Sequence, residues 1–396
     1  MAEKAVSRIE RVEVFDFTYI VENIGIAFQD AHNHVGYLKG GRMPMSKYAI
    51  IIVCDDGSRG EYVTQWGGTR SALAQTLQLV ADLPGRDPDE REFFYKEWNR
   101  RLCHTDHMGQ GPVDIALWDL AGKQSGKSVA DMIGRYRSEI LAYASTYHGD
   151  HTGMLDSYDA YCDFAVQCRE MGYKAFKHHG WFEGDAKVEA TLIQKLREQI
   201  GESLTLMYDA ASDLQTFGDA LYVGRACDDA EYFWYEDPYK DNSMSSFSHR
   251  KLRSLIKTPL LITEHVRALE SKCDFILADG TDFVRTDPEY DMGITGAIKT
   301  ARMAEAFGLD VEVHACGPAH RQVVGAVQNT NFYEIATVGP KLPNILPPCY
   351  ACGYKDDIDS IGADGCVPIP DDPGLGVVYD WDWLNAHTTQ RHVFSN

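Results

Sequence analysis

The sequence predicts a parallel α/β barrel, preceded by an α+β region of about 140 residues. From about Leu141 onward, short apolar runs alternate with amphipathic segments, which is the pattern of repeated βα units. Most of these runs end in an ionisable residue, as barrel strands do at the end that carries function. Eight such runs over roughly 200 residues fit a (β/α)8-type barrel better than an open sheet.

The barrel strands are expected at regular intervals. They cover Leu141–Thr146, Tyr173–His179, Leu204–Asp209, Tyr232–Asp237, Pro259–His265, Phe283–Pro288, Asp310–Ala315 and Phe332–Thr337. Helical periodicity fills the gaps, for example at Leu155–Met171, Asp185–Ile200, Met244–Ile256 and Thr295–Phe307.

The region before the barrel combines strands and helices. Arg8–Tyr19 and Lys47–Gln65 alternate like antiparallel strands, and the second run contains a turn at Asp55-Asp56-Gly57. Helical periodicity follows at Thr69–Leu83, Pro88–Leu102 and Gly111–Ser125. Between the strands, the stretch Val21–Ser46 contains several glycines together with His32 and His34, and we expect it to be a loop that acts as a lid.

Composition excludes several classes of protein. The chain of 396 residues carries 59 Asp and Glu against 38 Lys and Arg, a formal net charge of −21, which disfavours nucleic acid and anionic membrane surfaces as partners. No apolar run approaches the roughly 20 residues needed to span a bilayer, and the first residues lack the apolar core of a signal peptide. We therefore expect a cytoplasmic globular protein. Taken alone, the acidic excess would also argue against an anionic substrate.

The ten cysteines are expected to be reduced, because no secretory signal accompanies them. They occupy positions Cys54, Cys103, Cys162, Cys168, Cys227, Cys273, Cys316, Cys349, Cys352 and Cys366. Cys349 and Cys352 form a lone CxxC, and no second pair of cysteines or spaced histidines completes a zinc site.

Ionisable residues end seven consecutive predicted strands. In chain order they are His179, Asp209, Glu236, Glu264, Asp287, His314 and Glu334, spaced by 30, 27, 28, 23, 27 and 20 residues. Each interval is about one βα unit, and the carboxyl ends of barrel strands converge on one mouth. We therefore expect these seven side chains to meet.

Three carboxylates on adjacent strands predict a metal site. Asp209, Glu236 and Glu264 would repel one another unless a cation lay between them, and a set of oxygen ligands without cysteine suits a hard ion. Mg²⁺ fits best, because it needs few protein ligands and keeps water or substrate oxygens in its shell.

The other strand ends predict acid–base chemistry. Lys177 and His179 are two residues apart on a strand and should both point into the barrel, whereas His178 should face the helices. On the opposite side, a carboxylate at Asp287 would orient the imidazole of His314 as an acid or base. Glu334 could donate a hydrogen bond to a substrate oxygen if it were protonated.

Together with these residues, further motifs resemble the enolase superfamily, and within it the mandelate racemase subgroup. They are Gly111-Pro-Val-Asp-Ile-Ala-Leu-Trp-Asp-Leu-Ala-Gly122, Gly172-Tyr-Lys-Ala-Phe-Lys177, Tyr235-Glu-Asp-Pro238, Gly293-Ile-Thr-Gly296 and Ile369-Pro-Asp-Asp-Pro-Gly-Leu-Gly-Val377. The resemblance spans nearly the whole chain. It implies an α+β capping domain over residues 1–138, a (β/α)7β modified TIM barrel over 139–365, and a segment 366–396 that returns to the cap. Because such proteins tend to assemble, it also implies a homo-oligomer.

The resemblance implies a magnesium-dependent reaction next to a carboxylate, and the chemistry that we expect is dehydration of an aldonic or aldaric acid to a 2-keto-3-deoxy acid through an enediolate. By resemblance, Lys177 neutralises the substrate carboxylate. His179 stands where the subgroup usually has a second lysine, so it becomes the base, and His314 with Asp287 becomes the acid. The two histidines could exchange roles. Racemisation or epimerisation, cycloisomerisation, or a non-catalytic barrel are the alternatives.

The residues that would select the substrate are expected in the cap, where loops close over the site in this family. Candidates are His32, His34 and Trp66, the last in a turn with Gly67 and Gly68. His104 and His107 are spaced like metal ligands, but they belong with the cap helices and we interpret them as structural. With Mg²⁺ and Lys177 present, the mouth could accept a carboxylate despite the net charge of −21.

Overall fold

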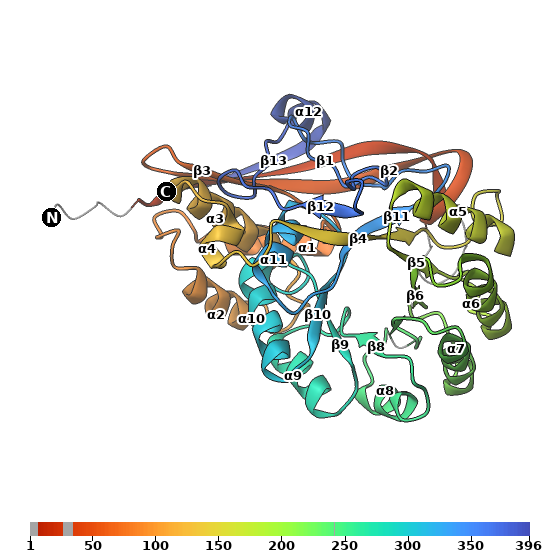
Figure 1. Cartoon of the computed structure of the whole chain (residues 1–396). Helices are drawn as coiled ribbons and strands as arrows, with labels where there is room; N and C mark the ends of the chain where they lie inside the picture. The colour runs from red at the N-terminus through yellow and green to blue at the C-terminus, as the bar shows by residue number, and fades with distance from the viewer. Residues whose placement is uncertain (1–6, 27–34, 241) are drawn as a thin grey trace.

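The structure, a computed structural model, describes residues 7–26, 35–240 and 242–396. An antiparallel sheet lies across one side of a ring of parallel strands and helices (Figure 1). Below, the first part is called the cap and the second the barrel.

The cap sheet has the strand order β13-β1-β2-β3. Its members are β1 (Ile9–Ile26), β2 (Val35–Cys54), β3 (Arg59–Val63) and β13 (Thr388–Ser395), and the helices nearby are α1 (Arg70–Val80), α2 (Arg91–Arg101), α3 (Gln110–Ser125) and α4 (Val129–Ile133). Alternate side chains of β2 and β3 face α3, and at Gly60 the approach is so close that a Cβ would lie 2.3 Å from the carbonyl oxygen of Ala116. The buried glycine therefore allows helix and sheet to meet.

The predicted loop at Val21–Ser46 is wrong over the described residues. β1 continues to Ile26 and β2 begins at Val35, and the two strands pair, for example at Val21 with Met43. A shift of register between Glu22 and Ile24 and several exposed side chains break the alternation that identifies a strand in a sequence. His32 and His34 lie outside the described residues, so their role stays a prediction.

The barrel contains all eight predicted strands. They run in the order β10-β9-β8-β7-β6-β5-β4-β11, all parallel, as β4 (Glu139–Thr146), β5 (Ala175–His179), β6 (Thr205–Asp209), β7 (Tyr235–Glu236), β8 (Leu260–Ile262), β9 (Phe283–Thr286), β10 (Asp310–Val313) and β11 (Tyr333–Val338). The helices between them are α5 (Tyr158–Met171), α6 (Ala186–Ile200), α7 (Phe217–Asp229), α8 (Ser246–Arg253), α9 (Leu269–Leu277), α10 (Gly293–Ala306) and α11 (Pro318–Ala326). The predicted (β/α)7β arrangement is confirmed, because no helix separates β11 from the next strand, β12 (Cys366–Pro368), in the described chain.

Hydrogen bonds outside the regular ladder join the two ends of this strand order. The backbone N–H of Val311 in β10 donates to the carbonyl oxygen of Asn329 at 2.7 Å. The side-chain amide of Asn331, which precedes β11, donates to Glu312 at 2.7 Å. The curved sheet is thus closed between β10 and β11 by the segment that leads into β11.

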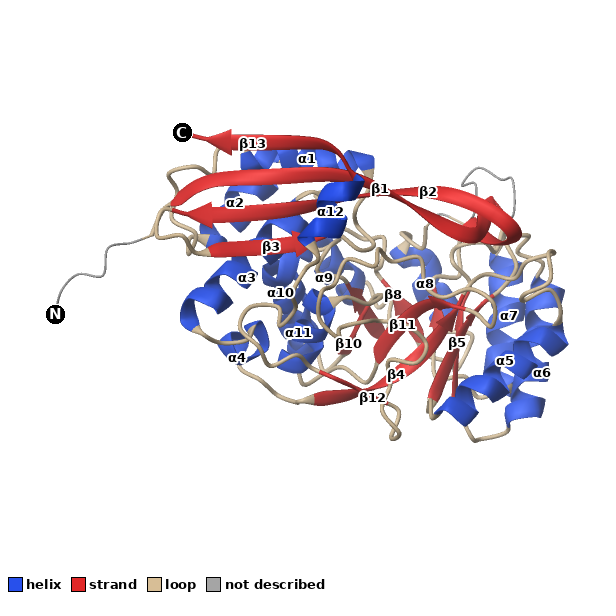
Figure 2. Ribbon diagram, turned by 90° about the horizontal axis from the view of Figure 1, so that it is seen from above, coloured by secondary structure: helices blue, strands red, loops and turns tan. Residues whose placement is uncertain are grey.

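After the barrel, the chain returns to the cap. β12 pairs antiparallel with β4, α12 (Trp381–His387) follows, and β13 then pairs with β1 (Figure 2). The rings of Trp381 and Trp383 pack on Phe15 and Phe17 of β1, with centroids 5.2 and 5.9 Å apart. None of the described helices combines the length and the apolar character that crossing a membrane would require.

Inside the barrel, apolar and charged side chains lie in successive layers. One layer is apolar and comprises Tyr143, Ala175, Met207, Trp234, Leu261 and Phe332. Two residues further along the strands, the same face carries charged side chains, for example Lys177 after Ala175, Asp209 after Met207 and Glu236 after Trp234. The apolar layer closes the bottom of the barrel, and the charged layer stands above it.

The carboxyl group of Glu189 in α6 is buried beside β6. It accepts hydrogen bonds from the backbone N–H of Trp181 at 2.9 Å and from the hydroxyl of Tyr208 at 3.2 Å. Burial raises its pKa to about 8, against the lowering effect of these two bonds. The folded protein therefore holds this proton more tightly than the unfolded chain.

We expect Glu189→Gln to stabilise the protein at pH 8 relative to the wild type. Because the folded pKa is raised above the unfolded value of 4.5, the contribution of Glu189 is greatest below pH 4.5 and declines by about 1.4 kcal/mol per pH unit up to about pH 8. The amide stays neutral and removes this decline. Urea unfolding at pH 5 and pH 8 measures it, with exposed Glu198→Gln as the control; equal pH dependence in all three proteins would contradict the prediction.

Candidate active site

The charged layer brings Lys177 into contact with three carboxylates. Its Nζ atom lies 3.1 Å from Asp209, 2.8 Å from Glu236 and 3.0 Å from Glu334, and its side chain is 1% exposed. Burial opposes its charge, but Glu236 and Glu334 outweigh burial and raise its pKa well above the ordinary value. Lys177 is therefore a permanent cation that balances carboxylates from β6, β7 and β11.

Arg285 is a second buried cation in this layer, and the sequence reasoning missed it. It lies on β9, with Nε 2.8 Å from Glu236 and a terminal nitrogen 2.7 Å from Glu334. Despite burial, Lys177 and Arg285 hold the pKa of Glu334 well below its ordinary range. The interpretation of Glu334 as a protonated donor is therefore wrong. The position of Arg285, two residues before Asp287 on an apolar strand, was the signal that could have identified it.

The carboxylates around β6, β7 and β8 exceed the positive charge near them. Burial and the neighbouring Asp209 raise the pKa of Glu236 to about 7, against Arg285 and Lys177. Burial and the like charges of Glu264, Asp209 and Glu236 raise the pKa of Asp237 well above its ordinary value. One buried oxygen of Asp237 (Oδ1) has no hydrogen-bond partner among the described residues. A buried, oxygen-rich set with surplus negative charge fits a hard divalent cation.

The tightest group of potential ligand atoms lies on one side of this set. One ligand atom each of Asp237, Glu264 and His265 lie within 4.8 Å of one another. Among the described residues, no other group of three or more His, Cys, Asp or Glu residues meets this limit, so neither Asp209 nor Glu236 belongs to such a group. His265 Nε2 is 3.4 Å from Asp237 and 3.8 Å from Glu264. Sequence reasoning assigned no role to Asp237 or His265, although both directly follow predicted ligands.

His179 lies at the side of Asp209. Its Nδ1 is 2.7 Å from the carbonyl oxygen of Thr146, which can only accept, so Nδ1 donates. Its Nε2 faces Asp209 Oδ2 at 3.1 Å. The neighbouring His178 points outward as predicted, against the rings of Tyr161 and Tyr208, and burial lowers its pKa to about 3. Only His179 of this pair can exchange a proton at the mouth, through Nε2.

His314 lies at the opposite side, beside Glu264. Its Nδ1 is 2.7 Å from Asp287 Oδ2, so the predicted pairing exists, and its Nε2 is 3.4 Å from Glu264 Oε1. Burial lowers its pKa, but Glu264 and Asp287 outweigh burial and raise it to about 9. The other oxygen of Asp287 accepts from the backbone N–H of Glu289 at 2.6 Å and lies 3.3 Å from His320 Nε2. Asp287 is thus held from several sides and fixes the His314 ring.

Trp66 reaches the same region from the cap. Its ring centroid is 6.5 Å from that of His314, and its indole N–H donates to the carbonyl oxygen of Cys316 at 3.1 Å. The turn that carries it is bound by the buried carboxylate of Glu289. This carboxylate accepts four hydrogen bonds, from the Tyr62 hydroxyl at 2.8 Å and from the backbone N–H groups of Gln65, Trp66 and Gly67 at 2.8, 2.6 and 2.6 Å. Glu289 therefore joins the cap to the barrel two residues after Asp287.

We expect Glu289→Gln to loosen this turn. An amide group replaces one carboxylate oxygen and leaves two cap donors facing another donor, which costs about 1–3 kcal/mol for each unpaired group. Hydrogen–deuterium exchange should be faster at the amides of residues 65–67, and the free energy of unfolding should fall. Glu270→Gln, at an exposed position, is the matched control. Unchanged exchange at residues 65–67 would mean that Glu289 does not hold the turn.

The remaining candidates lie elsewhere. His107 Nε2 is 3.3 Å from the carbonyl oxygen of Asn99 in α2, and His104 is exposed. All ten cysteines are free, with Cys349 buried and Cys352 exposed.

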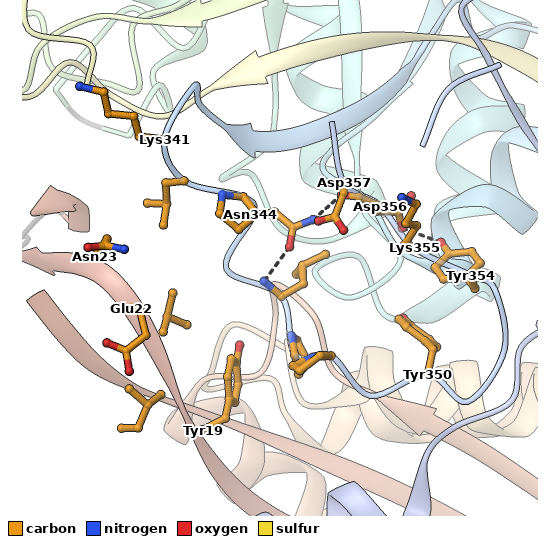
Figure 3. A pocket seen from close by; sticks show the side chains of 17 residues that line it. Tyr19, Glu22, Asn23, Lys341, Asn344, Tyr350, Tyr354, Lys355, Asp356 and Asp357 are labelled. Atoms are coloured by element: carbon orange, nitrogen blue, oxygen red, sulfur yellow. Dashed lines mark hydrogen bonds between the residues drawn. The ribbon is translucent and has the colours of Figure 1, made fainter. Parts of the chain in front are cut away.

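A cavity of about 530 Å³ lies between β1 and the segment that follows β11 (Figure 3). Its walls include Tyr19, Tyr350, Tyr354 and Asp357. None of the seven strand-end residues lines it, so this cavity is separate from the charged layer.

Comparisons with known proteins match both parts of the chain. Residues 160–383 match the family model described as enolase C-terminal domain-like, and residues 40–134 match the N-terminal domain of mandelate racemase/muconate lactonizing enzymes. L-talarate/galactarate dehydratase of Salmonella typhimurium is 25% identical, with 73% of each chain covered. D-galactarolactone cycloisomerase of Agrobacterium fabrum is 26% identical over 85% of this chain and 89% of the relative. The crystal structure of D-glucarate dehydratase from Agrobacterium tumefaciens complexed with magnesium has a TM-score of 0.82 and 27% identity, covering 98% of this chain and all of that chain.

Proposed function

The chain belongs to the mandelate racemase/muconate lactonizing enzyme family of the enolase superfamily, and we propose that it is a Mg²⁺-dependent dehydratase of a sugar acid. The observation that carries this proposal is the placement of two histidines on opposite sides of a row of carboxylates. His179 faces Asp209 at 3.1 Å, and His314 faces Glu264 at 3.4 Å. Removal of water from a hydroxy acid needs a proton acceptor and a proton donor at one site.

Asp209, Glu236 and Glu264 would hold the magnesium ion, and the surplus negative charge around them supports this assignment. When bound, Mg²⁺ would supply positive charge to the oxygens of a substrate carboxylate and thereby acidify the neighbouring carbon. The magnesium complex of the glucarate dehydratase relative adds support.

His179 is the proposed base. The Thr146 carbonyl accepts the proton on Nδ1, so Nε2 is the atom through which the ring would take the proton from the carbon next to the substrate carboxylate. A histidine here acts in place of the lysine that the family usually has. The same residue also holds the backbone at this position, because the N–H of His179 donates to the Thr146 hydroxyl at 3.1 Å.

His314 is the proposed acid. Asp287 accepts the Nδ1 proton, stabilises the charged ring and directs Nε2 toward the mouth. Nε2 gives its proton to the hydroxyl on the next carbon, which leaves as water, and the resulting enol tautomerises to the 2-keto-3-deoxy acid. The two histidines exchange these roles if the substrate has the opposite configuration at C2.

Lys177 and Arg285 act as fixed positive charges. Their contacts with Glu236 and Glu334 hold the floor of the site in place. We propose that the charge of Lys177 also attracts the substrate carboxylate, as the family resemblance implies. Together they make the mouth receptive to an anion in a chain of net charge −21.

A library screen tests the function. Purified protein with Mg²⁺ is incubated with aldonic and aldaric acids, and keto-acid formation is measured with and without a chelator. We expect at least one acid to give a 2-keto-3-deoxy product that disappears when the metal is removed. Absence of product across a broad library would overturn the proposal.

Epimerisation is the second candidate, because proton acceptors on both faces of a carbon also permit inversion. In D₂O, an epimerase would incorporate deuterium at the α-carbon and yield both configurations without any keto-acid. A cycloisomerase, the activity that the Agrobacterium fabrum relative is named for, would instead open or close a ring without loss of water. The same incubations, analysed by NMR, separate these outcomes from dehydration.

A further inference from the structure

Lys47 differs from the other buried basic residues that the structure describes. It is 9% exposed, and no hydrogen bond or ion pair partners its ammonium group among the described residues. The other four buried lysines and arginines all contact carboxylates. Lys177 and Arg285 contact Glu236 and Glu334 in the charged layer. Lys272 lies 2.7 Å from Asp291, and Arg321 lies 2.5 Å from Asp356. An ammonium group on a largely buried side chain without a counter-ion is costly, so its retention calls for a ligand.

The side chain of Lys47 lies under the turn that carries Trp66. A Cβ on Gly68 would be 2.8 Å from Lys47 Cδ and 2.3 Å from the Thr64 hydroxyl, so only glycine lets the lysine stem pass there. Burial lowers the pKa of Lys47, and the carboxylate of Glu289, which binds this turn, raises it against this effect. Lys47 and Glu289 thus both approach this turn, and the Trp66 ring that it carries lies 6.5 Å from the ring of His314.

Gln65, at the start of this turn, is a second buried group with unused capacity. Thr64 pairs with Tyr48 through its backbone N–H at 3.0 Å, and the same register places Gln65 level with Lys47. The Gln65 amide nitrogen donates to the Val63 carbonyl and to the Tyr350 hydroxyl, but its Oε1 is buried and has no hydrogen-bond partner among the described residues. Paired positions of the cap thus carry a cation and an acceptor, each without a partner among the described residues.

We propose that Lys47 and Gln65 form a cap subsite that binds the far end of the substrate, and that the substrate is an aldaric acid. Lys47 binds the second carboxylate, and Gln65 Oε1 accepts a hydrogen bond from a neighbouring hydroxyl. A carboxylate and a hydroxyl on adjacent carbons satisfy both groups, whereas the terminal CH₂OH of an aldonic acid would leave the ammonium unpaired.

The inference rests on the proposed function, because the first carboxylate is the one that reacts in the barrel. The Trp66 turn connects the two ends of the site, since it touches Lys47 through Gly68 and approaches His314 through the indole. Burial lowers the pKa of Lys47 and Glu289 opposes this, so a bound carboxylate would add the pairing that the folded chain lacks.

Lys47→Met tests the subsite, with Lys187→Met on the exposed surface as the matched control. The substrates are aldaric and aldonic acids of the same configuration, in the galacto, gluco and talo series. For the aldaric acid, we expect Lys47→Met to raise KM by about 10- to 100-fold, with a much smaller change in kcat. For the aldonic acid, KM should change by less than about threefold, and Lys187→Met should change neither. Equal losses for both acids would overturn the proposal.

Thermal unfolding without substrate gives an independent readout. Methionine has a similar length and no charge, so Lys47→Met should have a midpoint equal to or above that of the wild type. A lowered midpoint together with unchanged aldaric acid binding would assign Lys47 a structural role and overturn the subsite. Lys47→Gln, measured in parallel, keeps a polar group and should show the same loss of binding.

Calorimetric binding of the aldaric acids in the presence of Mg²⁺ separates this proposal from the proposed dehydration. Binding that weakens in Lys47→Met but not in Lys187→Met supports the subsite even if the wild type forms no keto-acid, in which case only the reaction is wrong. Turnover of aldaric acids with binding that does not depend on Lys47 overturns the subsite and leaves the reaction standing.

Discussion

Glu236→Gln is expected to abolish magnesium binding and turnover while the protein stays folded. Glu236 is the middle member of the carboxylate row and contacts Lys177 and Arg285, each at 2.8 Å. An amide removes one negative charge from the proposed metal ligands while both cations remain, so we expect Mg²⁺ affinity to fall by at least about 100-fold. Keto-acid formation should become undetectable. Calorimetric titration with Mg²⁺ alone checks the binding, independently of any substrate.

The direction of the stability change distinguishes a metal ligand from a structural ion pair. Because the folded pKa of Glu236 is raised to about 7, its contribution to stability is greatest below pH 4.5 and is lost as the pH rises toward 7. Without metal at pH 8, Glu236→Gln should therefore be at least as stable as the wild type. Adding Mg²⁺ should raise the unfolding midpoint of the wild type but not of the variant. Glu202→Gln, on the exposed surface, should behave like the wild type. A Glu236→Gln protein unchanged in metal binding and turnover would support a non-catalytic barrel.

The barrel was predictable because its strands follow a simple rule. An apolar run followed by an ionisable residue recurs once per βα unit, and the closing of the barrel brings these residues together. Parallel register then places Asp209 beside Glu236 and His179 beside Asp209 without further information. The Asp287–His314 pair follows from the same rule, because β9 and β10 are neighbours.

Contacts between cap and barrel were not predictable in this way. Glu289 binds the Gln65 N–H, 224 residues away in sequence, and no periodic pattern encodes such a distance. In the sequence, Lys47 is one polar residue in a strand of alternating apolar and polar residues. Its burial depends on a turn that this alternation does not specify. The protonation state of Glu334 could not be predicted from the sequence either, since it depends on Arg285 from another strand. A sequence pattern locates a residue along a strand or helix. The charge state of its side chain depends, in contrast, on the groups that several elements place around it.

His314→Asn is expected to separate the two proton transfers. If His314 is the acid, the variant should lose dehydration by about 10²- to 10⁴-fold, because no group then protonates the departing hydroxyl. His179 remains fixed between Thr146 and Asp209, so exchange of the α-hydrogen with solvent should continue. In D₂O, NMR should show deuterium entering the substrate without formation of keto-acid. His179→Asn should differ from His314→Asn by losing exchange as well as dehydration.

Asp287→Asn refines this result, because it keeps the His314 ring in place but removes the charge beside it. The Nδ1 proton can still be donated to the amide oxygen, whereas the positive charge on His314 loses the partner that lies 2.7 Å away. We therefore expect slower dehydration than in the wild type, with exchange of the α-hydrogen preserved. Loss of exchange in both His314→Asn and Asp287→Asn, with exchange intact in His179→Asn, would reverse the assignment and make His314 the base. Because each variant changes one named step, the pattern across the three proteins assigns both histidines.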